Sequence, residues 1–217
     1  MPIDFEQARF AMVEQQVRPW EVLDPRVLDV LSGVRREDYV PPKHRKLAFA
    51  DLGLPLEHGE VMFKPVVEGR LLQALDLGAD QEVLEIGTGS GFLSACLGRL
   101  ARAVTSIDIH PDFIERARQR LHADQVGNVR LDAADAMHWD PGRQFDAVLV
   151  GAAVESLPAH MLGWVRPGGC LVAIRGLSPA QEAVRLVNAD GGWREESLFE
   201  TDVPYLHGAA PVARFQL

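Results

Sequence analysis

The sequence predicts an α/β fold whose mostly parallel, doubly wound sheet is covered by helices on both faces. Between residues 65 and 176, short apolar segments alternate with helical segments, as in a parallel sheet whose strands are joined by helices. After residue 180 polar and apolar residues alternate around Asp190-Gly191-Gly192, as in an antiparallel hairpin. Near the N-terminus, in residues 4–18, the apolar residues recur at helical spacing. We therefore expect an antiparallel end to the sheet and an N-terminal helical extension.

Length and composition indicate one compact unit. A chain of 217 residues buries roughly 70% of its unfolded surface in a single core. Its hydrophobic content of 47% and charged content of 24% are ordinary for a globular protein. Within this unit we expect the extension to span residues 1–64 and the sheet domain to span residues 65–217.

Charge and hydropathy exclude several classes of partner. A net charge of −9 disfavours nucleic acid, because neutralising phosphates requires a basic face. No apolar run approaches 18 residues, so we expect no membrane span. The N-terminal segment MPIDFEQARF lacks the apolar core of a secretion signal, and Cys96 and Cys170 lie in apolar segments typical of buried thiols. These features predict a cytoplasmic protein.

The extension begins with two predicted helices. Residues 4–18 have apolar side chains at helical spacing after Asp4, which can cap the helix. In the second helix Asp24 is the expected cap, Pro25 occupies the first helical position, and Gly33 marks the stop.

The remaining elements follow from breaks and periodicity. Residues 39–64 contain several prolines and glycines without a sustained period, so we expect an irregular segment with one short helix over residues 43–49. Beyond it, the expected helices are 65–76, 92–101, 111–125 and a short one near 158–163, and the expected strands are 82–86, 103–109, 128–133, 145–153 and 170–176.

The segment VLEIGTGSGF (residues 83–92) joins a strand to a helix through three alternating glycines. Gly87 allows the chain to leave the strand with unusual dihedral angles, Gly89 allows a ligand to approach the backbone, and Gly91 allows the next helix to pack closely. The N–H groups at the start of that helix are free to face a ligand. We expect these glycines and Thr88 to bind a ligand.

The acid before the turn selects the type of ligand. The dinucleotide fingerprint requires a third glycine where Phe92 stands, and the Gly-Lys-Ser/Thr of a phosphate-binding loop is absent. Glu85 directs a carboxylate toward the turn, which is unfavourable beside a pyrophosphate and favourable beside a cation. We therefore expect a cationic cofactor.

Two further carboxylates complete the predicted site. Asp108 ends the next strand, where an acid accepts hydrogen bonds from ribose hydroxyls, with Ile109 beside it; the alternative is that Asp108 caps the following helix. Asp135 and Ala136 follow the third strand and are expected at the adenine, with Asp132 as the competing acceptor. An adenosine site with a positively charged end is the description of S-adenosyl-L-methionine.

At this point the sequence resembles the class I methyltransferases and, more narrowly, the protein-L-isoaspartate O-methyltransferase family. The general signs are VLEIGTGSG, SIDI, FDAVLVGAA and VRPGGCLVAI, and the narrower signs are MVEQQVRPWEVLDPRVLDVLSGVRREDYVPP, LAFADLGLPLEHGEVMFKP and FETDVPYLHG. The resemblance covers nearly the whole chain.

The resemblance implies a Rossmann-like sheet of about seven strands with an antiparallel end. It also implies a methyltransferase domain at residues 65–217 that uses S-adenosyl-L-methionine to methylate the carboxylate of isoaspartyl residues in damaged proteins. The cofactor residues that it carries over are Glu85, Gly87, Gly89, Gly91, Asp108 and Asp135.

One segment departs from the family pattern. Members that repair isoaspartate typically have Thr-Ile-Ser before a proline, and this chain has Val61-Met62-Phe63, then Lys64 and Pro65. In the family this segment lines the passage between cofactor and acceptor. Two alternatives therefore stay open: a methyltransferase with a less polar, unidentified small-molecule acceptor, and a non-catalytic cofactor-binding protein.

The acceptor-side candidates are His58, Phe63 and Lys64. A carboxylate acceptor needs no base, whereas a hydroxyl or amine acceptor benefits from one. His58 is the candidate base, with His207 as an alternative, and we expect His110 at the cofactor rim. The histidine spacing matches no metal-binding motif, so we expect no metal site.

Overall fold

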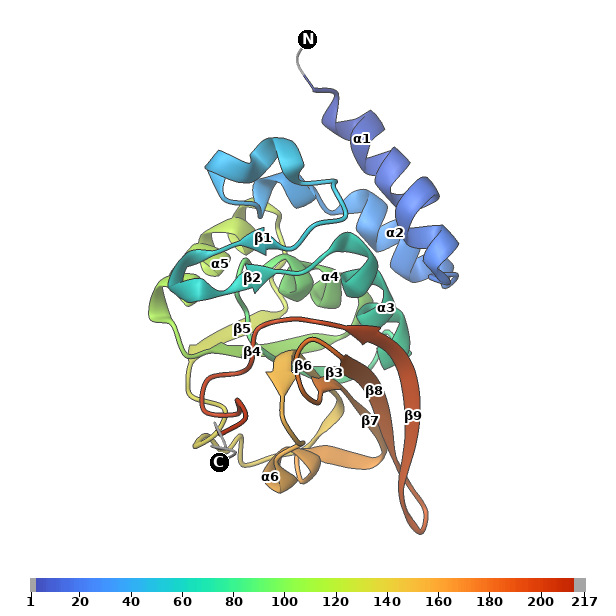
Figure 1. Cartoon of the computed structure of the whole chain (residues 1–217), viewed down its shortest axis with the longest axis vertical. Coiled ribbons are helices and arrows are strands. Elements are labelled where there is room, and N and C mark those ends of the chain that lie inside the picture. The colour runs from blue at the N-terminus through green and yellow to red at the C-terminus, as the bar shows by residue number, and fades with distance from the viewer. Residues whose placement is uncertain (1–2, 213–217) are drawn as a thin grey trace, which may run out of the picture.

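A seven-stranded sheet forms the centre of the protein (Figure 1). The computed structural model describes residues 3–212. The strands of this sheet are β3 (Glu82–Ile86), β4 (Ala103–Asp108), β5 (Val129–Ala133), β6 (Phe145–Val154), β7 (Val165–Arg175), β8 (Gln181–Ala189) and β9 (Gly192–Thr201). Their order is β5-β4-β3-β6-β7-β8-β9. The pairs up to β6–β7 are parallel, and β7–β8 and β8–β9 are antiparallel, which confirms the predicted α/β class and its antiparallel end.

The strand order places a topological switch point at β3. From β3 the chain builds outward through β4 and β5, and it then returns to the other side of β3 to form β6 and β7. In open α/β sheets, ligands bind at the carboxyl ends of the strands beside such a reversal. The glycine turn that follows β3 lies at this position.

Apolar side chains on both faces of the sheet explain the helical layers. The helices of the sheet domain are α3 (Pro65–Leu75), α4 (Phe92–Leu100), α5 (Pro111–Ala123) and α6 (Ala159–Leu162). Alternate strand residues belong to different cores, since Val83 packs in the cluster that contains helix α4 and Leu84 packs in the cluster that contains Trp164. Strands buried on both faces read as continuous apolar segments, which is why the sequence revealed them.

The N-terminal extension contains the two predicted helices. Asp4 caps α1 (Phe5–Met12) by accepting from Glu6 N and Gln7 N, but beyond Met12 the expected helix continues as a π-helical turn (Val13–Val17) and a 3-10 turn (Arg18–Trp20). Pro19 lies in that last turn and has no N–H to continue an α-helical ladder. Helix α2 (Pro25–Gly33) is capped by Asp24, as predicted.

The part of the extension between α2 and α3 is more ordered than expected. It contains 3-10 turns at Arg36–Asp38 and Pro42–Leu47, the latter where a short helix was predicted. It also contains a small antiparallel pair, β1 (Leu54–Pro55) and β2 (Val61–Met62), which we call the β1–β2 hairpin (residues 54–62). The hairpin lies beside α5 (Figure 1). Two-residue strands are too short for a period of two to be visible in a sequence.

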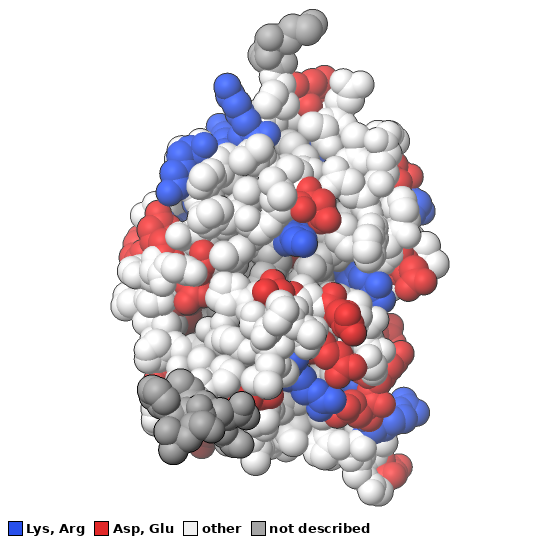
Figure 2. Space-filling model, in the orientation of Figure 1, with Lys and Arg blue, Asp and Glu red and all other residues white. Residues whose placement is uncertain are grey.

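One apolar cluster joins the extension to the sheet domain. It includes Met12 and Leu31 of the extension, Leu71 of α3 and Leu97 of α4, each of them fully buried. The domain boundary at residues 64 and 65 stays a prediction. Within residues 3–212, no helix has both the length and the apolar character needed to cross a bilayer. On the face shown in Figure 2, acidic and basic side chains are interspersed.

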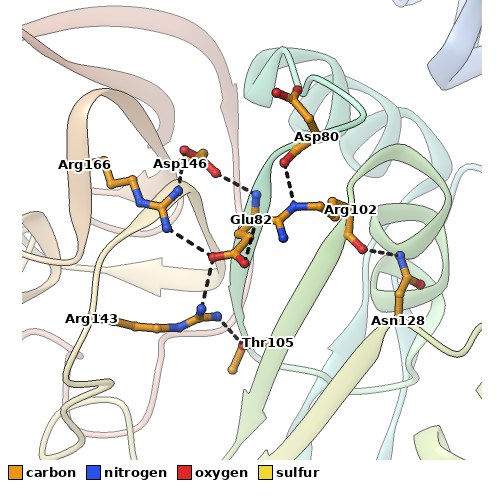
Figure 3. Close-up of polar contacts among 8 residues, drawn as sticks. All are labelled: Asp80, Glu82, Arg102, Thr105, Asn128, Arg143, Asp146 and Arg166. Atoms are coloured by element: carbon orange, nitrogen blue, oxygen red, sulfur yellow. Dashed lines mark hydrogen bonds and ion pairs between the residues drawn. The ribbon is translucent and has the colours of Figure 1, made fainter.

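An ion-pair network holds the amino ends of the central strands (Figure 3). The Glu82 carboxylate accepts from Arg102 at 2.9 Å, Arg143 at 3.0 Å and Arg166 at 3.1 Å. Asp146 accepts from Arg166 and from the backbone N–H of Glu82. This network lies at the end of β3 opposite to the glycine turn, so it fixes strand register rather than contributing to a ligand site.

Candidate functional site

The glycine turn has the backbone geometry that its sequence requires. Gly87, Gly89 and Gly91 have φ of +90°, +50° and +83°, a region that side chains with a Cβ rarely adopt. The N–H groups of Gly87 and Thr88 donate to Ile107 O of β4, which holds the turn against the neighbouring strand. A Cβ on Gly91 would lie 2.9 Å from Ala117 Cβ of α5, so the close helix packing expected at this glycine is present.

Asp108 is held in place at the end of β4. Its carboxylate accepts from Gly89 N at 2.8 Å and from His110 N at 2.9 Å, and the residue is 6% exposed. Burial raises its pKa above the ordinary value. The N-cap of α5 is His110, so Asp108 does not serve as the helix cap that was its alternative role. One turn N–H therefore ties the carboxylate directly to the glycine loop.

A narrow cavity lies between the turn, the end of β4 and the β1–β2 hairpin. Its volume is about 70 Å³. Six of the predicted cofactor residues line it, namely Gly87, Gly89, Asp108, Ile109, Asp135 and Ala136. From the hairpin side, Leu56, Glu60 and Val61 line it, and His110 and His207 also contribute. We call this space the cofactor cavity.

The structure separates the two candidate acids after β5. Asp135 lines the cofactor cavity, and its carboxylate accepts from Met137 N and contacts His138 Nδ1 at 2.9 Å. The hydrogen bond with His138 lowers the pKa of Asp135. Asp132 instead pairs with Arg130 and does not line the cavity. Geometry therefore favours Asp135 at the adenine position.

Glu85 does not line the cofactor cavity. It shares its face of β3 with Val83, is fully buried, and accepts a hydrogen bond from Ser94 of α4. A hydroxyl chain continues from Ser94 through Ser106 to Thr88 in the turn, with Thr88 Oγ1 and Ser106 Oγ 2.6 Å apart. Burial raises the pKa of Glu85 to about 7, and its Oε1 has no hydrogen-bond partner among the described residues. The Glu85 carboxylate is therefore linked to the glycine turn through the hydroxyl groups of Ser94, Ser106 and Thr88.

A second cavity of about 40 Å³ lies on the acceptor side of the turn. Val61, Met62 and Phe63 form one wall, and Thr88 and Ser90 of the turn form another. Phe63 is 6% exposed and packs in the apolar core. The sequence expectation of an apolar wall is therefore matched by the geometry of this acceptor-side cavity. Its lining also includes residues not singled out from the sequence, among them Leu56, Glu68, Leu93 and Gly151.

A buried ion pair supports that wall. Arg36 of the extension is fully buried and donates to the carboxylate of Glu68, to Phe63 O at 2.7 Å and to Ala48 O at 2.7 Å. Burial raises the pKa of Glu68 above its ordinary value, and Glu68 lines the acceptor-side cavity. Because the guanidinium holds Phe63 through its backbone, the pair fixes the position of the wall.

Besides Glu85, three predicted residues lie outside both cavities. Lys64 is exposed at the N-cap of α3, and Gly91 faces α5. His58 is exposed on the hairpin, where its ring stacks on His110 with centroids 4.0 Å apart and its Nε2 lies 2.9 Å from Asp112 Oδ1. A candidate base should line the reacting space, so this placement does not favour His58 in that role.

Some lining residues had a signal in the sequence and others had none. Gly151 interrupts the apolar strand β6, and a Cβ there would lie 2.9 Å from Ile86 O. An isolated glycine inside a strand often marks such a close approach, so this residue could have been found. Leu56 lines both cavities, but nothing in its local sequence distinguishes it from other apolar loop residues.

A larger hollow of about 480 Å³ adjoins the turn on its α5 side. Three guanidinium groups line it: Arg35 pairs with Asp38, Arg116 pairs with Glu57, and Arg120 donates to Ser90 O at 2.7 Å. Its size exceeds that of the cofactor cavity, but it contains neither Asp108 nor Asp135. The conjunction of the switch point, the glycine turn and those acids identifies the smaller cavity as the candidate site.

Comparison with known proteins agrees with this geometry. The family model for protein-L-isoaspartate(D-aspartate) O-methyltransferase matches residues 7–205. A protein-L-isoaspartate O-methyltransferase of Myxococcus xanthus is 38% identical over 152 residues, which cover 70% of this chain and 72% of the relative. The one from Parvibaculum lavamentivorans is 33% identical over 210 residues and covers 94% of both chains.

A solved structure shares the fold. A Plasmodium falciparum chain crystallised with S-adenosyl-L-homocysteine, and described as a protein-L-isoaspartate O-methyltransferase, superimposes with a TM-score of 0.79 at 17% identity. The match covers 91% of this chain and 97% of that one. With the family model spanning nearly the whole sequence, this chain belongs to the protein-L-isoaspartate(D-aspartate) O-methyltransferase family.

Proposed function

We propose that the protein transfers a methyl group from S-adenosyl-L-methionine to the side-chain carboxylate of isoaspartyl residues in damaged proteins. The observation that carries this proposal is the cavity at the β3 switch point, where the left-handed glycine turn and the Asp108 carboxylate meet. Membership of the family supports the choice of acceptor.

The residues around the cavity fit a nucleoside cofactor. Gly87 and Gly89 leave a cradle that side chains would narrow, and residues with a Cβ rarely adopt their positive φ. We propose that Asp108 accepts from ribose hydroxyls and that Asp135 and Ala136 contact the adenine. We propose Thr88 and Ile109 as further contacts and Glu85 and Gly91 as positioning residues beneath the turn.

When bound, the cofactor supplies an electrophilic methyl group on a sulfonium. The protein contributes orientation and exclusion of water, because an ionised carboxylate attacks without a general base. Val61, Met62 and Phe63 would exclude water from the acceptor side. The absence of a base from the reaction agrees with the position of His58 outside both cavities.

The β1–β2 hairpin narrows the cofactor cavity. The cofactor cavity of about 70 Å³ is far smaller than ordinary small-molecule sites of roughly 300–1,000 Å³. Leu56 and Val61 narrow it from the hairpin side, whereas the sheet side is a packed core. We therefore propose that the hairpin opens to admit the cofactor and closes over it.

A methyl-transfer assay tests the proposed reaction. Labelled S-adenosyl-L-methionine is incubated with an isoaspartyl peptide and with the same peptide containing ordinary aspartate. We expect base-labile label on the isoaspartyl peptide alone. Asp108→Ala should abolish transfer, and Asp132→Ala, which removes a half-buried acid outside the cavity, should not. If the unmodified protein transferred no more methyl label to the isoaspartyl peptide than Asp108→Ala does, the proposal would be contradicted.

The apolar acceptor-side wall favours a second candidate, a methyltransferase for a less polar small molecule. Val61 and Phe63 stand where family members typically offer hydroxyl groups to the acceptor. The double variant Val61→Thr, Phe63→Ser restores them. Under the isoaspartyl proposal, the unmodified chain already methylates the peptide. If only the double variant does so, the second candidate is supported instead.

For the location we propose the cytoplasm, where a repair enzyme meets ageing proteins. Cys96 and Cys170 are both free and buried, as the sequence predicted. Unpaired thiols are typical of a reducing compartment. The proposed partner is a protein or peptide that presents a carboxylate.

A further inference from the structure

A cluster of metal-ligating side chains joins the β1–β2 hairpin to the start of α5. One ring nitrogen of His58, one of His110 and one carboxylate oxygen of Asp112 all lie within 4.8 Å of one another. His58 comes from the hairpin, and His110 and Asp112 lie at the N-terminal end of α5. The two groups are 54 positions apart in sequence, so spacing motifs could not reveal them.

We propose that these three residues form a divalent transition-metal site that holds the hairpin closed over the cofactor cavity. Two imidazoles and one carboxylate are the ligand types that zinc prefers, and imidazole also suits nickel, cobalt and copper. Three protein ligands would leave room for water at the fourth position. The closing role rests on the proposed function, whereas the site itself does not.

The two imidazoles stack face to face, so one ring must rotate before both ring nitrogens can face one ion. The two imidazole planes differ by only 7°, and each packs edge-on against the buried Phe113 ring at a centroid distance of 5.4 Å. His58 adopts a φ of +60°, which is uncommon for a residue with a Cβ and directs its ring toward α5. Tetrahedral zinc places its ligand atoms roughly 3.3 Å apart, and rotation of the exposed His58 ring out of the stack would bring its nitrogen toward such an arrangement.

Local charge favours a cation in spite of a nearby arginine. The Arg116 guanidinium forms an ion pair with Asp112, with Nη2 2.5 Å from Oδ2, whereas Asp112 Oδ1 faces His58 Nε2. Glu57 balances the guanidinium at 2.9 Å, and Glu60 Oε1 lies 4.0 Å from His110 Nε2. With both histidines neutral the surroundings are net negative. Metal binding would replace the His58–Asp112 hydrogen bond, with the imidazole proton moving to Nδ1.

The position of the cluster gives the metal a structural consequence. His110 and Phe113 line the cofactor cavity opposite Leu56, Glu60 and Val61 of the hairpin. A metal that bridges His58 to His110 and Asp112 would therefore cross the edge of this cavity. Under the proposed opening of the hairpin, the bound metal should slow cofactor exchange.

Zinc binding to the chelator-treated full chain, without cofactor or peptide, tests the site independently of the reaction. We expect calorimetry to give one zinc per chain, and cobalt substitution to give the absorption of a tetrahedral site. His58→Ala removes one of three ligands and should weaken binding at least as much as loss of an outer-shell partner, about 10- to 100-fold. His122→Ala removes another exposed histidine of α5 and should leave zinc affinity unchanged.

Zinc binding that is absent, or equal in His58→Ala and the unmodified chain, would overturn the site. His58 is exposed, so its removal should not prevent folding, and circular dichroism checks this. The release rate of S-adenosyl-L-homocysteine measures the closing role. We expect zinc to slow release in the unmodified chain and in His122→Ala, but not in His58→Ala. Zinc that binds without slowing release would overturn the closing role alone.

Discussion

Replacing Gly91 by alanine tests the packing of the glycine turn most sharply. The residue has a φ of +83°, and an added Cβ would lie 2.9 Å from Ala117 Cβ and 3.2 Å from Ala117 Cα. The left-handed conformation costs a residue with a Cβ about 1–2 kcal/mol. Overpacking against α5 costs about 1–3 kcal/mol more. We expect Gly91→Ala to lower the free energy of unfolding by about 2–5 kcal/mol.

A matched variant and a compensating variant separate the two causes. Gly33→Ala adds a Cβ where no atom lies within 4 Å, and φ there is ordinary, so its stability should change little. Ala117→Gly removes the nearest clashing atom and by itself costs about 1 kcal/mol, as glycine does in a helix interior. In the double variant with Gly91→Ala, it should restore the stability lost to overpacking but not the stability lost to the left-handed backbone conformation.

Urea unfolding, followed by circular dichroism, measures these free energies. A double-mutant cycle should give a coupling energy of about 0.5–3 kcal/mol between positions 91 and 117. Additive effects would show that the close approach of α4 and α5 is not what excludes a side chain at Gly91. A Gly91→Ala variant as stable as the unmodified protein would refute both the backbone and the overpacking parts of the reasoning.

Three further variants test the site residues. Asp108→Ala should weaken S-adenosyl-L-homocysteine binding by about 1.5–3 kcal/mol in calorimetry, whereas Asp132→Ala should not, and equal affinities would refute the ribose assignment. Burial raises the pKa of Glu85 to about 7, so the folded state binds this proton more tightly than the unfolded chain. As the pH rises from 5 to 8, the free energy of unfolding of the unmodified protein should therefore fall by up to about 3 kcal/mol. The Glu85→Gln variant should not show this loss, so parallel pH profiles of the two proteins in urea unfolding would contradict the prediction. Glu68→Ala leaves Arg36 buried without a carboxylate and should cost about 3–5 kcal/mol in urea unfolding, whereas Glu68→Ala combined with Arg36→Met should recover part of that loss; no recovery would argue against the ion pair as the cause.

The element order could be predicted because each strand is a continuous apolar segment between strong breaks. Val83 and Leu84 face different cores, so both had to be apolar, and Gly87 ends the strand where the chain must turn. Asp108 could be placed at the site because the carboxyl ends of adjacent parallel strands lie together. These features are encoded within a few residues of one another.

The remainder depends on contacts between distant segments. Both faces of β3 are buried, so periodicity could not show that Glu85 points toward Ser94 rather than into the cavity. The hairpin that carries Leu56 has no local pattern, and only its register brings His58 to Asp112. The buried Arg36 was equally hidden, since a charged residue in a loop normally indicates solvent exposure.

The most direct test of the account is a crystal structure of the chain with S-adenosyl-L-homocysteine. We expect the ribose on Asp108, the adenine beside Asp135 and Ala136, and the sulfur facing Val61, with Leu56 moved aside and the hairpin closed over the ligand. A ligand seated instead in the larger hollow beside Arg120, or a cavity still closed by Leu56 at saturating ligand, would contradict the account.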